Sequence, residues 1–361
     1  FRDHVTGLEY IRGNRGLAEG GLYVELAAYQ YHVFLDFREV HDDDQHPYTE
    51  LAAHLGGRGV PSVEEALKWV LLEPIHRPFR ELVHPGHLRH LVETYAEPSQ
   101  PAPLRQQQAL DEAERRVALL LDAIVQHEQS SDKGNTIAAV AAEVRQKLQA
   151  ALRLPTLMEQ FPELRSLDCD WVGDYLGAGL RQEGPAWSAL LGWTFTHLLG
   201  KVLDPDDDVG LSRSWMDEWL LGQVLEDTLN ELTADDRAAR QALATIKVLI
   251  SHQRWFEVGA GSPEPTFHVL EHLLRDAEVQ RLLGVNRHQG ILWFRQESFD
   301  QLLWWLWVTA VVTLTAEASR SQGGTRDDLV RVCRVIRQLQ AAEAASGYQV
   351  EQLLEAARYR P

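Results

Sequence analysis

Between residues 22 and 38 hydrophobic positions alternate with polar ones, which is the pattern of β-strands with two different faces. One face carries Leu22, Val24 and Leu26 in a first run, and Tyr29, Tyr31, Val33, Leu35 and Phe37 in a second. We predict two antiparallel strands, joined at Ala27 and Ala28. Because two strands are not stable alone in water, we expect them to pack on the helical part of this chain or on strands that precede Phe1.

After residue 46 the period of the pattern changes from strand to helix. The most hydrophobic stretch is 298–318, where only Thr309 interrupts the apolar run from Leu302 to Val312. Ser298 and Gln301 form a capping box, which predicts that a helix begins there. A helix that is apolar on nearly every side must be enclosed, so we predict a buried central helix. A membrane or interfacial segment is the alternative, but the run is shorter than the about 20 apolar residues that span a bilayer.

Start and stop signals predict further helices. Pro47 is placed to open a helix through Leu55, and Ser62 with Glu65 forms a capping box for a helix through Leu72. Three prolines are expected to divide the region that follows into short helices, namely Pro74, Pro78 and Pro85. Longer helical patterns cover 104–129, 136–152, 212–232, 234–256 and 348–359.

These patterns divide the chain into three regions. Residues 1–44 hold the two strands, residues 45–97 hold short connecting helices, and residues 104–361 form an α-helical domain around the buried helix 298–318. The proline-rich segment Glu97–Pro103 separates the last two regions. We therefore predict a mainly α fold, in which a multi-helix domain follows a short N-terminal antiparallel β-hairpin.

Charge and cysteine content exclude several classes of function. A net charge of −18 over 361 residues argues against nucleic-acid binding and against binding to anionic membranes. Two cysteines, Cys169 and Cys333, make no disulfide framework in a chain of this length, so we expect reduced thiols and a cytoplasmic location. The chain starts at Phe1 without a signal-peptide pattern, and we expect that a larger protein continues upstream.

No complete catalytic constellation is found in the sequence. The nucleophile-elbow, P-loop and dinucleotide-binding motifs are missing in their required contexts. Two segments, 41–46 (HDDDQH) and 84–90 (HPGHLRH), contain residue types that ligate metals, but neither has the spacing of a known site. A solvated loop needs no such geometry and is the favoured explanation of the first segment. We therefore expect no catalytic residue, no metal and no cofactor.

The one polar cluster that suggests ligand binding lies at 284–294. Asn286, Arg287 and His288 stand between two glycines, just before Trp293 and the most apolar part of the chain. Polar loops on a rigid apolar scaffold often bind ligands. These four residues are our candidates for ligand binding, although a loop that merely connects two helices has the same appearance and is favoured.

Two segments near the N-terminus, RDHVTGLEYIRG and GLYVELAAYQYHVFLDFREV, resemble the closing strands of the β-sandwich that follows the catalytic barrel in α-amylase-type glycoside hydrolases (family 13). Parts of the helical region resemble the long C-terminal tail of some large bacterial members, namely Leu190–Val202, Ser212–Gly222, Ile250–Phe256 and Leu283–Phe294. The resemblance implies that the β-hairpin is left over from a β-sandwich. The barrel motifs of the family have no counterpart here, so no catalytic residue carries over.

The resemblance implies a non-catalytic C-terminal region of an α-amylase-like glycoside hydrolase or glucanotransferase that acts on α-glucans, with a structural or assembly role. The implied partners are the upstream catalytic barrel of the same polypeptide and α-glucan. The reaction of the whole protein would be hydrolysis or transfer at α-1,4 linkages by paired carboxylates. The alternative is an independent α-helical scaffold or protein-interaction domain. A self-contained enzyme with its site at 286–293 would require a pocket at that position.

Overall fold

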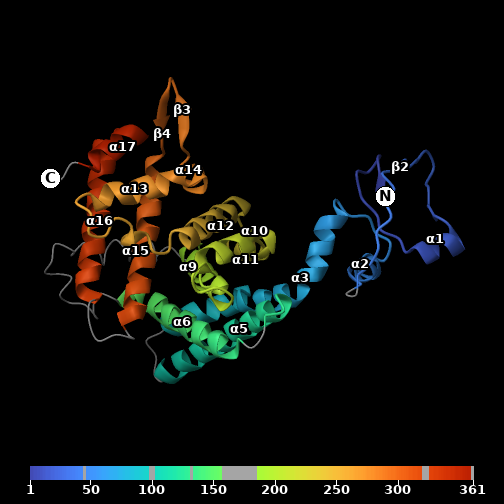
Figure 1. The fold of residues 1–361 in the computed structure, drawn as a ribbon, viewed down its shortest axis with the longest axis horizontal. Helices are drawn as coiled ribbons and strands as arrows, with labels where there is room; N and C mark the ends of the chain where they lie inside the picture. The colour runs from blue at the N-terminus through green and yellow to red at the C-terminus, as the bar shows by residue number, and fades with distance from the viewer. Residues whose placement is uncertain (44–45, 97–101, 131–132, 157–184, 319–324, 359–361) are drawn as a thin grey trace. The chain divides into compact units, whose positions relative to one another are not determined.

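The computed structural model describes residues 1–43, 46–96, 102–130, 133–156, 185–318 and 325–358. Within these residues the fold is mainly α, as the sequence predicts (Figure 1). The chain forms two compact units, Phe1–Arg77 and Pro78–Pro361. The division falls inside helix α3.

Unit 1 combines a short strand pair with helices. Its elements are β1 (Arg2–Asp3), α1 (Asn14–Gly20), β2 (Phe34–Leu35), α2 (Pro47–Leu55) and the first part of α3 (Val63–Leu82). β1 pairs antiparallel with β2. The prediction of two strands within 22–38 is wrong, because residues 21–33 form no strand. Tyr29 and Asp36 adopt left-handed backbone conformations, with φ of 67° and 55°, which interrupts an extended chain on both sides of β2.

The strand pair of unit 1 is anchored by the buried carboxylate of Asp3, whose residue is 0% exposed. This carboxylate accepts hydrogen bonds from the backbone N–H of Val5 at 3.0 Å and from the hydroxyl of Thr6 at 2.7 Å. Nδ1 of His32 lies 2.7 Å from its second oxygen. Burial alone would raise the pKa of Asp3, but the hydrogen bonds from Thr6, His32 and the backbone outweigh it and hold that pKa well below its usual range.

The helix starts of unit 1 follow their sequence signals. Helix α2 covers Pro47–Leu55 as predicted, and Asp42 caps it by accepting from the N–H of Tyr48 at 2.7 Å. The hydroxyl of Ser62 accepts from the N–H of Glu65 at 3.2 Å, which confirms the start of α3. However, α3 runs on through Pro74 and Pro78 to Leu82, so the predicted division there is wrong, whereas Pro85 does begin a new helix. Burial on α3 offsets the hydrogen bonds lost at the prolines, since Ile75, Phe79 and Leu82 are all 0% exposed.

Unit 2 consists of helices together with a second strand pair. Its first elements are α4 (Pro85–Ala96), α5 (Ala102–His127), α6 (Gly134–Leu152), η1 (Leu154–Thr156), α9 (Pro185–Thr196), η3 (Leu199–Val202), α10 (Asp208–Glu218), α11 (Leu221–Thr233) and α12 (Asp236–Ser251). They are followed by η4 (Trp255–Glu257), α13 (Pro265–Arg275), α14 (Ala277–Leu282), β3 (Asn286–His288), β4 (Ile291–Trp293), α15 (Gln296–Ala318), α16 (Thr325–Ala345) and α17 (Val350–Ala356).

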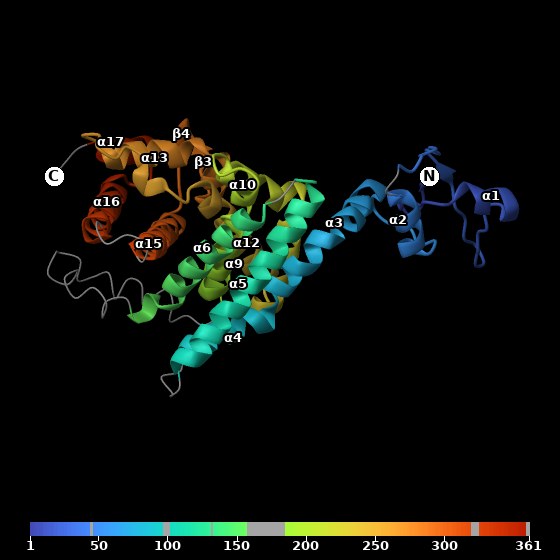
Figure 2. The same cartoon turned by 60° about the horizontal axis from the view of Figure 1, so that its bottom comes forward.

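Helix α15 is the buried helix that the sequence predicts, although it begins at Gln296 and not at Ser298. It packs against α16 and α6, and α6 in turn packs along α5 (Figures 1 and 2). The indole N–H of Trp255 donates to the carbonyl of Leu306 at 2.9 Å and ties η4 to the middle of α15. Among the described residues, α15 alone has the length and hydropathy to cross a membrane, and most of it is buried within unit 2.

Two of the longer predicted helices are each split in the structure. The pattern over 212–232 belongs to α10 and α11, which are separated at Leu220, where φ is 57°. The pattern over 234–256 belongs to α12 and η4. Periodicity alone missed both breaks because the hydrophobic positions continue through them: Leu220, Ile250 and Trp255 are all buried.

Candidate functional site

The four residues that the sequence nominated for ligand binding lie on a β-hairpin and not on a loop. β3 pairs antiparallel with β4, so that Asn286 stands opposite Trp293 and His288 opposite Ile291 (Figure 1). Asn286, Arg287 and His288 are exposed and Trp293 is half-buried. Successive residues of a strand face opposite sides, so Arg287 faces away from its two neighbours. The four side chains do not converge, and none of the cavities described below includes them.

The two segments with metal-ligand residue types serve the fold. In segment 41–46, Asp42 caps helix α2. In segment 84–90, Nδ1 of buried His87 lies 2.6 Å from the carbonyl of Leu82, while Nδ1 of His84 accepts from the N–H of Gly86 at 3.1 Å. Within the described residues, no group of three or more His, Cys, Asp and Glu side chains could hold a metal ion.

A polar cavity of about 240 Å³ is a candidate site in unit 2. Its wall comes from α6, η3, the start of α10, the segment from the end of α12 to η4, and α13. The polar and charged residues that line it include Glu143, Lys147, Lys201, Asp208, His252 and Arg254. Gly200 allows η3 to approach α10 closely, since a Cβ at this position would lie 2.4 Å from the carbonyl oxygen of Asp208.

Lys147 is the unusual residue of this cavity, because it is a lysine that is only 5% exposed. Its Nζ lies 2.9 Å from Nε2 of His197, which is itself fully buried. Nδ1 of His197 lies 2.9 Å from the carbonyl of Trp193. A carbonyl only accepts, so Nδ1 carries the proton and Nε2 presents a lone pair to Lys147. The pair is therefore an amine donating to a neutral imidazole.

The carboxylates nearest to Lys147 pair with other cations. Lys201 lies 2.8 Å from Glu143, and Arg254 lies 2.7 Å from Glu317. Burial lowers the pKa of Lys147 to about 8. The two carboxylates have a smaller effect in the opposite direction, and the two cations a smaller effect in the same direction. Burial and the adjacent lysine lower the pKa of His197 well below its usual value, so the imidazole is neutral. Perturbed ionisable groups in a cavity are a mark of functional sites.

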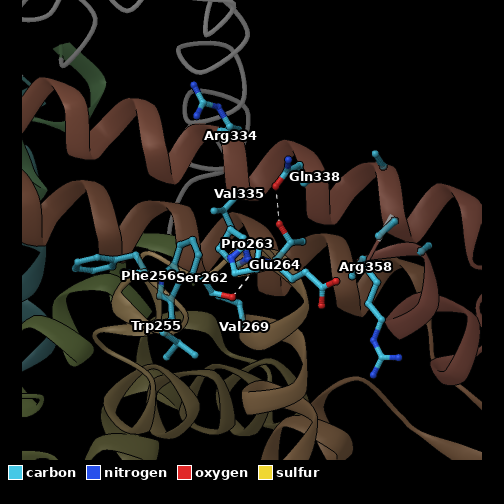
Figure 3. A pocket seen from close by; sticks show the side chains of 18 of the residues that line it. Trp255, Phe256, Ser262, Pro263, Glu264, Val269, Arg334, Val335, Gln338 and Arg358 are labelled. Carbon is cyan, nitrogen blue, oxygen red and sulfur yellow. Dashed lines mark hydrogen bonds between the residues drawn. The ribbon is translucent and has the colours of Figure 1, made fainter. Parts of the chain in front are cut away.

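A second, larger cavity of about 940 Å³ lies between α13, α16, α17 and the turn after η4 (Figure 3). Trp255 and Phe256 stand at one end of the view in Figure 3 and Arg358 at the other. Across it, the hydroxyl of Thr266 donates to Gln338 at 2.6 Å. The guanidinium of Arg358 lies 4.1 Å from the ring centre of Phe267. The wall is mixed, with alanines, buried aromatic rings and arginines, and it contains no buried ionisable pair comparable to Lys147 and His197.

Unit 1 carries a different candidate feature, a row of exposed apolar side chains. The five alternate residues on one face of the second predicted strand are exposed as follows: Tyr29 104%, Tyr31 67%, Val33 41%, Leu35 45% and Phe37 64%. Phe34, on the opposite face, packs against Phe1 with 5.3 Å between the ring centres. Phe37, a member of the five, also stacks on Phe1, with 5.1 Å between the ring centres. Burial alternates only over residues 31–35, where Tyr31, Val33 and Leu35 are exposed and His32 and Phe34 are half-buried. We call this set of five the outer row.

The sequence contains a signal for the polar cavity, namely a lysine on the buried face of α6. Val140, Val144, Leu148 and Ala151 mark the buried stripe of α6, and Lys147 falls within that stripe. A lysine on the apolar face of an amphipathic helix needs a partner or a cavity. Its partner His197 could not be identified from the sequence, because the two residues are 50 positions apart.

No protein-family model matches this sequence, and neither a curated protein nor a solved structure matches it.

Proposed function

We propose that this chain is the non-catalytic C-terminal region of an α-amylase-like glycoside hydrolase or glucanotransferase that acts on α-glucans in the cytoplasm. In this proposal unit 1 attaches the helical unit to β-structure that belongs to the catalytic part of the same polypeptide. The reaction of the whole protein is hydrolysis or transfer at α-1,4 linkages, and its paired carboxylates lie outside this chain. α-Glucan is the proposed ligand of the whole protein.

The observation that carries the proposal is the exposure of the outer row. Tyr29, Tyr31 and Phe37 leave most of their side-chain surface in water, although burying one large apolar side chain contributes about 1.5–3 kcal/mol. Contiguous exposed apolar surface on a folded protein marks an interaction site. The alternation of exposed and half-buried residues over 31–35 fits a partner that is itself a β-sheet. The resemblance to the end of a family 13 β-sandwich identifies that sheet in the proposal.

The distribution of exposed apolar residues bears on the alternative, an independent helical scaffold. In the described part of unit 2, the strongly exposed large hydrophobic residues are Leu104, Leu119, Ile291 and Tyr348, which lie on α5, β4 and the turn before α17. The larger group lies within residues 22–40 of unit 1. This favours attachment through unit 1 over a docking face on the helical unit.

The test begins with the reading frame that encodes the chain. We expect it to contain an α-amylase-type barrel before the codon for Phe1, with its nucleophile aspartate and acid/base glutamate. That barrel with its sandwich, produced separately, should bind the purified chain 1–361 in calorimetry. The chain alone should not release sugars from starch. A frame without such a barrel, or turnover of starch by the chain alone, contradicts the proposal.

Matched variants show whether the outer row makes the contact. Replacing Tyr29, Tyr31 and Phe37 by Ser should weaken binding by a factor of about ten or more, since three apolar contacts are lost. Leu104→Ser with Leu119→Ser is the control, because these side chains are 61% and 54% exposed on α5 of unit 2. Equal affinity of both variants would assign the contact to another surface.

A further inference from the structure

We propose that Lys147 is a carbonyl-binding amine: with His197 as its proton acceptor, it forms an imine with a small aldehyde or ketone that enters the polar cavity. This site is independent of the outer row and of the proposed function.

The geometry provides a nucleophile and a base in contact. Nζ of Lys147 lies 2.9 Å from Nε2 of His197, and the bond from Nδ1 to the carbonyl of Trp193 keeps the lone pair on Nε2. An amine that is activated by an adjacent base is the usual arrangement for lysines that attack carbonyl groups. His197 is held by the end of α9 and is fully buried, so it has little freedom to turn away.

The arrangement differs from that of a lysine buried for stability. A structural buried ammonium is normally paired with a carboxylate. Here Glu143 and Glu317 pair with Lys201 and Arg254 instead, and among the described residues no carboxylate forms an ion pair with Lys147. An amine has more hydrogen-bonding capacity than one imidazole satisfies. The remaining capacity is available to a ligand in the cavity.

The cavity has room for such a ligand. Its volume of about 240 Å³ exceeds what one water molecule needs. Charged and titratable groups face it from each surrounding element: Glu143 from α6, Lys201 from η3, Asp208 from α10, His252 with Arg254 from the segment after α12, and His272 from α13. Burial raises the pKa of Asp208, whose side chain also lines the cavity. A carbonyl compound with hydroxyl groups matches this polar wall.

The reaction is balanced without any further reagent. The nitrogen of Lys147 attacks the carbonyl carbon, the amine proton passes to Nε2 of His197, and the carbonyl oxygen takes up a proton to give a carbinolamine. That hydroxyl then leaves as water while the C=N bond forms. One amine and one carbonyl compound give one imine and one water. The lowered pKa supports the step, because a lysine with a pKa of about 8 holds about 300 times more free amine at pH 7 than one at 10.5.

The test uses acetaldehyde and sodium cyanoborohydride on the intact chain, with peptide mapping by mass spectrometry. The chain has five lysines, Lys68, Lys133, Lys147, Lys201 and Lys247, so each can be followed separately. At pH 7 Lys147 should be alkylated about tenfold faster than the exposed Lys68, because its larger fraction of free amine outweighs its reduced access. A Lys147 rate equal to or below that of Lys68 contradicts the proposal.

A second measurement addresses the role of His197. In His197→Gln the amide can still bond to Lys147 but cannot take its proton, so the Lys147 rate should fall about tenfold or more while the Lys68 rate is unchanged. An unchanged Lys147 rate overturns the role of His197.

The pH profile of wild-type labelling is a third measurement, and it needs no variant. The Lys147 rate should level off above about pH 8, and a rate that still rises at pH 10 contradicts the proposal.

Discussion

Nδ1 of His32 lies 2.7 Å from Oδ2 of Asp3, and this contact joins two segments that are 29 residues apart. It holds the middle of the outer row, between Tyr31 and Val33, against the N-terminal strand, next to the pairing of β2 with β1. The row is thereby fixed on unit 1, while most of the side-chain surface of Tyr29, Tyr31 and Phe37 stays exposed. The attachment proposed for unit 1 depends on this anchor.

Removing the anchor should loosen the segment that carries the outer row. We expect Asp3→Asn to increase amide exchange at Val5 and Val33 several-fold, because both amides donate to the Asp3 carboxylate. Asp36→Asn is the control. Asp36 forms an ion pair with Arg2 at 3.3 Å, and because both side chains are exposed, this pair contributes little to stability. Exchange mass spectrometry that finds equal rates in the two variants would rule out Asp3 as the anchor.

The same carboxylate predicts a pH dependence for unit 1. The pKa of Asp3 is lowered in the folded chain, so the ionised group contributes stability above its unfolded pKa, near 3.8. That contribution is lost as the pH falls from this value through the lower folded pKa. We expect exchange of the Val33 amide, corrected for its intrinsic pH dependence, to rise below about pH 4 in wild type and not in Asp3→Asn.

How much of the fold could be predicted depended on whether the signal was local. Helices α2 and α15 were predicted because a proline, a capping box and an apolar run lie within the elements themselves. The strands of 22–38 were wrongly extended because strand formation needs a partner, and β2 finds only the two residues of β1. The alternation was still informative over residues 31–35, where it separates the half-buried His32 and Phe34 from the exposed Tyr31, Val33 and Leu35.

For the candidate sites, too, prediction depended on whether the signal was local in the sequence. Segment 286–293 was interpreted as a loop because its polar residues stand between glycines, whereas Gln289 and Gly290 with φ of 50° and 85° make the tight turn of a hairpin. The polar cavity is lined by residues of α6, η3, α10, α13 and the segment between α12 and η4, which are far apart in the sequence. Lys147, on the buried stripe of α6, is the residue whose position in the sequence indicates this cavity.

The polar cavity depends on the close approach of η3 to α10. A methyl group at Gly200 would lie 2.4 Å from the backbone oxygen of Asp208 and 2.8 Å from the backbone nitrogen of Ser212. We therefore expect Gly200→Ala to destabilise unit 2 by about 1–3 kcal/mol in urea unfolding. Gly86→Ala meets only the side chain of His84, at 3.2 Å, and should cost less. A Gly200→Ala variant as stable as wild type would contradict the observed packing.

Lys147 predicts a rise of stability at alkaline pH. Its pKa is lowered from 10.5 to about 8 on folding, so the unfolded chain binds the extra proton between these values and the unfolding free energy increases with pH. The increase should be at most of the order of 3 kcal/mol. Lys147→Met should remove this slope, whereas Lys68→Met should keep it because Lys68 is exposed. Urea unfolding between pH 7.5 and 10.5 measures both, and a slope that persists in Lys147→Met would assign it to other groups.

Amide hydrogen exchange at Tyr29, Tyr31 and Phe37, which lie outside β2, tests the attachment of unit 1 most directly. It compares the purified chain 1–361 with the complete product of its reading frame. We expect fast exchange in the purified chain and slow exchange in the complete protein, because strands of the catalytic part would then pair with this segment. Equally fast exchange in both, or exchange that is already slow in the purified chain, contradicts the attachment.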